Sequence, residues 1–66
     1  MTFGQKIKTR RVYIGMKQKE LADAVGVHPH ALRAWERDER MPSAAFLPSI
    51  CKSLEVSADY LLGIPK

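Results

Sequence analysis

The apolar residues of this 66-residue chain recur at helical spacing in five short segments. Phe3, Ile7, Arg11 and Ile14 lie at positions i, i+4, i+8 and i+11, on one face of a helix that Gly15 ends. No stretch alternates between apolar and polar residues for long enough to predict a strand. The pattern therefore predicts an all-α domain of five helices. The second helix comprises residues 18–25 and the third comprises residues 29–37. The fourth can be capped by Ser43 and carries Leu47, Ile50, Cys51 and Leu54 on one face. The fifth is ADYLL at 58–62, which Ser57 can cap.

Two residues, Pro48 and Arg11, interrupt this pattern. A proline inside a helix costs about 3 kcal/mol unless it lies in the first turn. Pro48 falls just beyond the first turn of its segment, so we expect that helix to begin irregularly. Arg11 lies on the apolar face of the first helix, where a buried charge needs a partner. Glu36 at the end of the third helix is the best candidate, and the alternative is that Arg11 extends along the surface to solvent.

The segment between Gln18 and Glu36 has the form of two short helices joined by a tight turn. The first helix ends at Gly26, Val27 follows as an apolar plug, and the second helix begins near Pro29. This is the pattern of a helix-turn-helix unit, whose second helix enters the major groove of DNA. Pro29 suits the first helical position, where its missing N–H costs nothing. His28 then stands in the N-cap position.

Length and composition favour one domain over residues 1–66 and a reducing environment, since Cys51 is the only cysteine. The sequence has no signal-peptide pattern and no apolar run of transmembrane length, so we expect a cytoplasmic protein. The net charge is +4, and residues 1–40 carry the whole excess, with nine Lys and Arg against five Asp and Glu. This asymmetry favours a surface that faces a polyanion. A solvated basic face without a partner is the alternative.

The sequence His28-Pro29-His30 resembles a pair of metal ligands. Structural zinc usually needs four ligands, and the only other strong ligand is Cys51, alone on an apolar face. We therefore predict no metal site and no cofactor. The chain also has no Gly-rich phosphate loop, no HExxH motif and no paired nucleophile and base, so we predict that it is not an enzyme.

The chain resembles the helix-turn-helix domain of the phage repressor and Cro family over nearly its whole length. The resemblance implies a compact five-helix domain that binds double-stranded DNA sequence-specifically and regulates transcription, usually as a repressor. It also implies a homodimer on a pseudo-palindromic operator. The matching residues are Gln18, Leu21-Ala22, Gly26-Val27, Leu32, Trp35-Glu36, Pro42-Ser43, Leu54, Val56-Ser57 and Asp59-Tyr60-Leu61-Leu62-Gly63.

The base-reading residues are expected on the third helix. With Leu32 and Trp35 facing the core, positions 30, 33, 34 and 37 share the opposite, exposed side. Arg33 suits guanine, which accepts two hydrogen bonds from a guanidinium, and the methyl group of Ala34 suits a thymine methyl. The family also reads bases with residues at the start of this helix. The base-contact candidates are therefore His28, Pro29, His30, Arg33, Ala34 and Arg37.

Phosphate contacts are expected from cations and from the start of the second helix, where the family grips phosphates through positions corresponding to Lys17 and Gln18. We assign this role to Arg11, Lys17, Gln18, Lys19 and Arg40, with Lys6, Lys8, Arg10 and Arg37 as further candidates. The family favours glycine where this chain has Asp38. That residue is expected to add a negative charge near the DNA backbone, offset by Arg37 and Arg40.

Two expectations concern protein partners. The family often forms its dimer around the last helix, which gives the candidates Val56, Tyr60, Leu62 and Ile64, although Tyr60 could equally belong to the core. The rival function is that of an antitoxin or interaction module whose main role is to bind a partner protein, or a regulator held by an antagonist protein.

Overall fold

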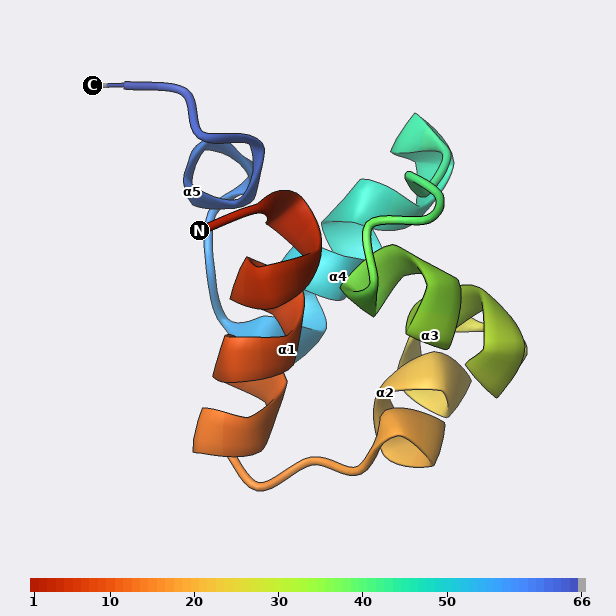
Figure 1. Cartoon of the computed structure of the whole chain (residues 1–66). Helices are drawn as coiled ribbons and strands as arrows, with labels where there is room; N and C mark the ends of the chain where they lie inside the picture. Colours follow the sequence, from red (N-terminus) through yellow and green to blue (C-terminus); the bar gives the residue numbers. More distant parts are fainter. Residues whose placement is uncertain (66) are drawn as a thin grey trace.

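Five α-helices and one 3₁₀ turn follow one another along residues 1–65, the part of the chain that the computed structural model describes (Figure 1). This part contains no strand, so the prediction of an all-α, five-helix fold is confirmed. None of its helices has the length and apolar character needed to cross a membrane. The elements are α1 (Phe3–Tyr13), α2 (Gln18–Val25), α3 (Pro29–Glu36), the turn η1 (Ala44–Phe46), α4 (Leu47–Leu54) and α5 (Ala58–Leu62).

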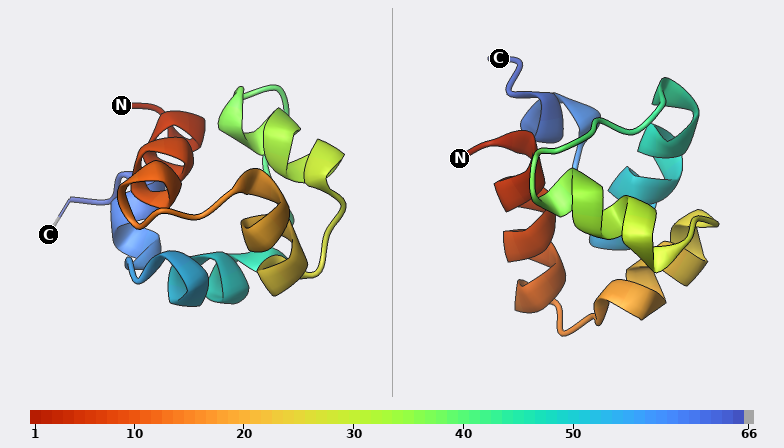
Figure 2. Two further views of the ribbon diagram at one scale, coloured as in Figure 1. Left: turned by 90° about the horizontal axis from the view of Figure 1, so that it is seen from below. Right: turned by 45° about the vertical axis from the view of Figure 1, so that its right-hand side comes forward.

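The core is formed by one to three apolar residues from each α-helix. α2 and α3 lie on one side of α1, and α5 lies on the other (Figures 1 and 2). Ala22 is fully buried, and its small side chain allows α2 and α3 to pack closely. Among the described residues, the largest fully buried side chains are Ile7, Leu21, Leu32, Ile50, Leu54 and Leu61.

The start of α3 follows the sequence prediction. His28 is the N-cap residue, and its Nδ1 accepts a hydrogen bond from the backbone N–H of His30 at 3.1 Å. Pro29 occupies the first turn, where its fixed φ suits the helix. Gly26 ends α2 with a φ of 86°, a left-handed conformation in which glycine is free of strain.

The irregular start expected before Pro48 is also present. Ser43 caps the 3₁₀ turn by accepting a hydrogen bond from the N–H of Ala45 at 3.3 Å. α4 begins only at Leu47, which places Pro48 in the first turn rather than beyond it. The proline therefore removes no intrahelical hydrogen bond.

Two cations on successive turns of α1 bind the C-terminal ends of other helices. Lys6 Nζ donates to the carbonyl of Tyr60 at 2.8 Å, and Arg10 Nε donates to the carbonyl of Leu54 at 2.8 Å. The last carbonyls of a helix have no partner within it, and a cation there also meets the negative end of the helix dipole. Lys6 and Arg10 thus fasten α5 and α4 to α1.

Candidate nucleic-acid interface

The base-contact candidates lie together on the outer face of α3. Leu32 and Trp35 are buried, as the periodicity predicts, and Glu36 is buried beside them. On the opposite side, Ala34 is half-buried and His30 and Arg33 are exposed; Arg37, also exposed, is the C-cap residue just after the helix. His28 and Pro29 precede them at the tip of the helix. This face offers donors, acceptors and one methyl group to a ligand.

The two histidines at the tip stack on each other, with ring centroids 4.6 Å apart and planes inclined by 18°. Because Nδ1 of His28 accepts the hydrogen bond from His30, its proton must lie on Nε2 when the ring is neutral. His28 can therefore donate outward from Nε2. His30 has no side-chain hydrogen bond in the described structure, so its ring can either donate or accept. No group of three potential metal ligands occurs among the described residues.

One flank of α3 carries a polar hollow of about 210 Å³, to which α1 and α2 also contribute. Glu36 is the single carboxylate in its wall, and that charge is matched by Arg11 beneath it. Three cations around the hollow have no acidic partner in the described structure, so the hollow carries an excess of positive charge. Its lining residues are Lys8, Gln18, Arg33, Glu36 and Arg37.

The expected pair of Arg11 and Glu36 is present beneath this hollow. Arg11 Nε donates to Glu36 Oε2 at 2.7 Å, and a second guanidinium nitrogen donates to Oε1 at 3.1 Å. The third nitrogen donates to the carbonyl of Met16 at 2.8 Å. Gln18 Nε2 adds a hydrogen bond to Glu36 Oε1 at 3.0 Å. α1, α2 and α3 are thus joined around one buried carboxylate.

These contacts correct part of the phosphate assignment. Arg11 is only 8% exposed and all three of its nitrogens have partners, so it is not available to bind phosphate. The amide of Gln18 points inward to Glu36, which leaves its backbone N–H, in the first turn of α2, as the group that can meet an anion. Lys6 and Arg10 are used by α5 and α4. Lys8, Lys17, Lys19 and Arg40 remain exposed.

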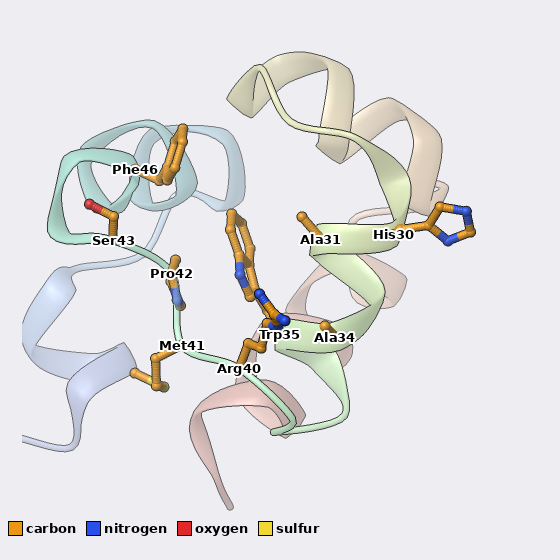
Figure 3. A pocket seen from close by; sticks show the side chains of 9 residues that line it. All are labelled: His30, Ala31, Ala34, Trp35, Arg40, Met41, Pro42, Ser43 and Phe46. Atoms are coloured by element: carbon orange, nitrogen blue, oxygen red, sulfur yellow. The ribbon is translucent and has the colours of Figure 1, made fainter.

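The other flank of α3 carries a mostly apolar hollow of about 430 Å³, whose lining also includes Arg40 and Ser43 (Figure 3). Trp35 points across it toward Phe46 and Pro42, and the Trp35 and Phe46 rings lie 5.8 Å apart. His30, Ala31 and Ala34 line its side on α3, with the ring of His30 pointing away from Trp35 (Figure 3). The exposed face of α3 therefore lies between a cationic flank and an apolar flank.

The predicted dimer residues lie on α5 and on either side of it in the sequence. Tyr60, Leu62 and Ile64 are 47%, 44% and 51% exposed, so Tyr60 is a surface residue rather than part of the core. Val56 is half-buried and lines a shallow hollow beside Tyr60. Three of the four predicted dimer residues are therefore exposed to solvent.

A family model described as Helix-turn-helix matches residues 7–61. The chain belongs to the helix-turn-helix family. Its relatives in this family include repressor protein C2 of Salmonella phage P22, which is 39% identical over 59 residues, 89% of this chain and 27% of C2. The transcriptional regulator ImmR of Bacillus subtilis is 36% identical over 63 residues, 96% of this chain and 50% of ImmR. The chain thus spans half or less of the length of these two helix-turn-helix proteins.

The fold comparison gives the same family. The crystal structure of the P22 c2 repressor in complex with a synthetic operator superimposes with a TM-score of 0.90 and 37% identity. The similarity covers 94% of this chain and 94% of that one. The prediction of a phage-repressor type of helix-turn-helix domain is therefore confirmed.

Proposed function

We propose that this helix-turn-helix domain binds double-stranded DNA sequence-specifically and regulates transcription as a repressor. The observation that carries the proposal is the exposed face of α3 beside a hollow ringed by three cations without acidic partners in the described structure. A protruding helix with polar side chains suits the major groove, and an adjacent cationic hollow suits the phosphate backbone. The activity is binding rather than catalysis, and it takes place in the cytoplasm.

Different parts of the surface around α3 contact the phosphate backbone and the base edges. Lys8 and Arg37 at the cationic hollow hold one phosphate backbone, together with the N–H groups at the start of α2 and the exposed Lys17 and Lys19. Arg40 faces the backbone on the other side. His30, Arg33 and Ala34 then meet base edges, and Arg33 reads guanine. His28 donates from Nε2 to a phosphate at the mouth of the groove.

The described functions of two relatives support this proposal. The P22 c2 structure is a complex with an operator, and ImmR is named as a transcriptional regulator. We further propose that two copies bind a pseudo-palindromic site through the surface formed by Val56, Tyr60, Leu62 and Ile64. Their α3 helices would then lie about one helical turn of DNA apart, roughly 34 Å.

Salt dependence separates DNA binding from the rival function of a protein-interaction module. We expect the logarithm of the association constant for a DNA duplex to fall by roughly 0.9 per neutralised phosphate for each log unit of salt. Replacing Lys17 by glutamine should make this slope less steep by about 0.9 if Lys17 contacts a phosphate. Both slopes are measured by fluorescence anisotropy of a labelled duplex over a salt range of about 50 to 300 mM.

Lys52→Gln is the matched control, because Lys52 is exposed on α4, outside the proposed interface, and loses the same charge. We expect it to leave the slope unchanged. Weak duplex binding with little salt dependence would contradict the proposal and favour an apolar protein interface.

A further inference from the structure

The second residue after α3 has an unusual backbone conformation. Asp38 has a φ of 60°, in the left-handed region where helices usually end on glycine. The N–H of Asp38 donates to the carbonyl of Trp35 at 3.1 Å, and the N–H of Glu39 donates to that of Ala34 at 2.9 Å. These bonds close the helix, and aspartate tolerates this conformation better than most residues do. A charged residue at this position is unusual, because glycine is the common choice.

The carboxylate of Asp38 binds the N-terminus of α1. Its Oδ2 accepts a hydrogen bond from Thr2 Oγ1, and its Oδ1 accepts one from the backbone N–H of Gly4 at 2.9 Å. Thr2 is the N-cap of α1, and α1 has no acidic residue in its own first turn. An anion at this end of a helix is favourable, because the first N–H groups lack partners and the helix dipole is positive there. Asp38 supplies that anion from the end of α3.

These hydrogen bonds favour the charged form of Asp38. The bond from Thr2, followed by the one from Gly4, holds the pKa of the Asp38 carboxyl below its ordinary value of 3.8. A lowered folded-state pKa means that the stabilisation is present above the ordinary value and is lost as the pH falls through the lower one. The tie between Asp38 and α1 is therefore fully formed near neutral pH.

Asp38 and Glu36 hold α3 to α1 at two separate places. Glu36 binds Arg11, toward the end of α1, and Asp38 binds the start of α1, about two turns away. The two ties together restrict the tilt of α3 more than either could alone. They also fix the chain at the point where it leaves α3, between the exposed Arg37 and Arg40.

We propose that Asp38 is a positioning residue for DNA recognition, an inference that rests on the proposed function. Through Thr2 and Gly4 it fixes the C-terminal end of α3 and the start of the next loop, so that Arg37 and Arg40 meet the backbone in one orientation. This replaces the expectation that Asp38 acts as a negative charge near the DNA, since its carboxylate is occupied by α1. The two ideas predict opposite effects of removing the carboxylate.

The test is Asp38→Gly, which retains a residue suited to a positive φ and removes the side chain that carries the carboxylate. Glu39→Gln is the control, because Glu39 is exposed, adjacent in sequence and without a side-chain hydrogen bond in the described structure. Affinities are measured by anisotropy for the best site selected from random DNA and for a scrambled duplex, at a temperature where every variant is folded. We expect Glu39→Gln to bind both duplexes as tightly as wild type or slightly more tightly. Asp38→Gly should bind the selected site about tenfold more weakly, with little change for the scrambled one.

A double-mutant cycle with Thr2→Ala removes the other partner without changing the charge. The effects of Thr2→Ala and Asp38→Gly on the selected site should be partly non-additive, because both substitutions remove the same Thr2–Asp38 hydrogen bond. Additive effects, or an Asp38→Gly variant that binds both duplexes more tightly as Glu39→Gln does, would overturn the proposal. A wild-type chain that binds no duplex would overturn the proposed function as well. Coupling between Thr2 and Asp38 in urea unfolding would then show that the tie exists but serves only the fold.

Discussion

Glu36→Ala is expected to destabilise the chain by about 3–5 kcal/mol, because it leaves the guanidinium of Arg11 buried without a counter-charge. The side chains of Arg11 and Glu36 are only 10% and 2% exposed, so solvent cannot replace the lost partner. The substitution also removes the acceptor of the Gln18 amide. A loss of this size is a large fraction of the stability of a small domain. Urea unfolding at neutral pH, followed by circular dichroism, measures it.

Two further variants show whether the loss comes from the buried charge. Glu39→Ala removes an exposed carboxylate three residues away and should change the unfolding free energy by less than about 0.5 kcal/mol. The double variant Arg11→Met, Glu36→Leu removes both charges and should recover much of the stability, because an apolar pair avoids the cost of an unpaired ion. An unchanged unfolding midpoint in Glu36→Ala would contradict the structural role of the pair.

Gly4→Ala is expected to be the second most damaging substitution, although alanine is normally preferred over glycine inside a helix by about 1 kcal/mol. A Cβ at this position would lie 2.4 Å from the carbonyl oxygen of Trp35 and 2.6 Å from that of Glu36. Both atoms belong to the backbone of α3, so relief requires α1 and α3 to move apart. Overpacking of this kind costs about 1–3 kcal/mol or more.

Thr9→Ala is the matched control for Gly4→Ala, because Thr9 is exposed on the same helix. It should leave the thermal midpoint nearly unchanged or raise it slightly, in line with helix propensity. Differential scanning calorimetry of the two variants provides the comparison. A Gly4→Ala variant with a midpoint at or above that of wild type would show that the close approach of α1 and α3 is not needed.

The features that the sequence predicted correctly depend on local patterns. The spacing of Ile7, Leu32 and Trp35 identifies the buried faces, because a helix repeats every 3.6 residues. Pro29 after His28 marks a helix start for equally local reasons. The pairing of Arg11 with Glu36 is long-range, yet it followed from placing a charge on an apolar face.

The features that the sequence did not predict depend on where helix ends meet in space. By sequence Lys6 and Arg10 are further candidates for phosphate contacts, but they bind carbonyls 54 and 44 residues away. Nothing local distinguishes such a cation from one that faces DNA. One local pattern is related to the contact between Asp38 and α1. Thr2 followed by Gln5 has the spacing of a capping box, which marks the start of α1. That pattern identifies the helix end but not the residue from α3 that binds it.

Selection of binding sites from random double-stranded DNA, performed in parallel with the wild-type chain and Arg33→Ala, tests the central claim that α3 reads DNA sequence. The wild type should enrich one pseudo-palindromic motif whose half-sites lie about one helical turn apart. Arg33→Ala should enrich the same motif with the preference for guanine lost at one position of each half-site, equivalent to about 1–3 kcal/mol of discrimination. No enriched motif for the wild type, or identical motifs for both proteins, would contradict the role assigned to Arg33 and α3.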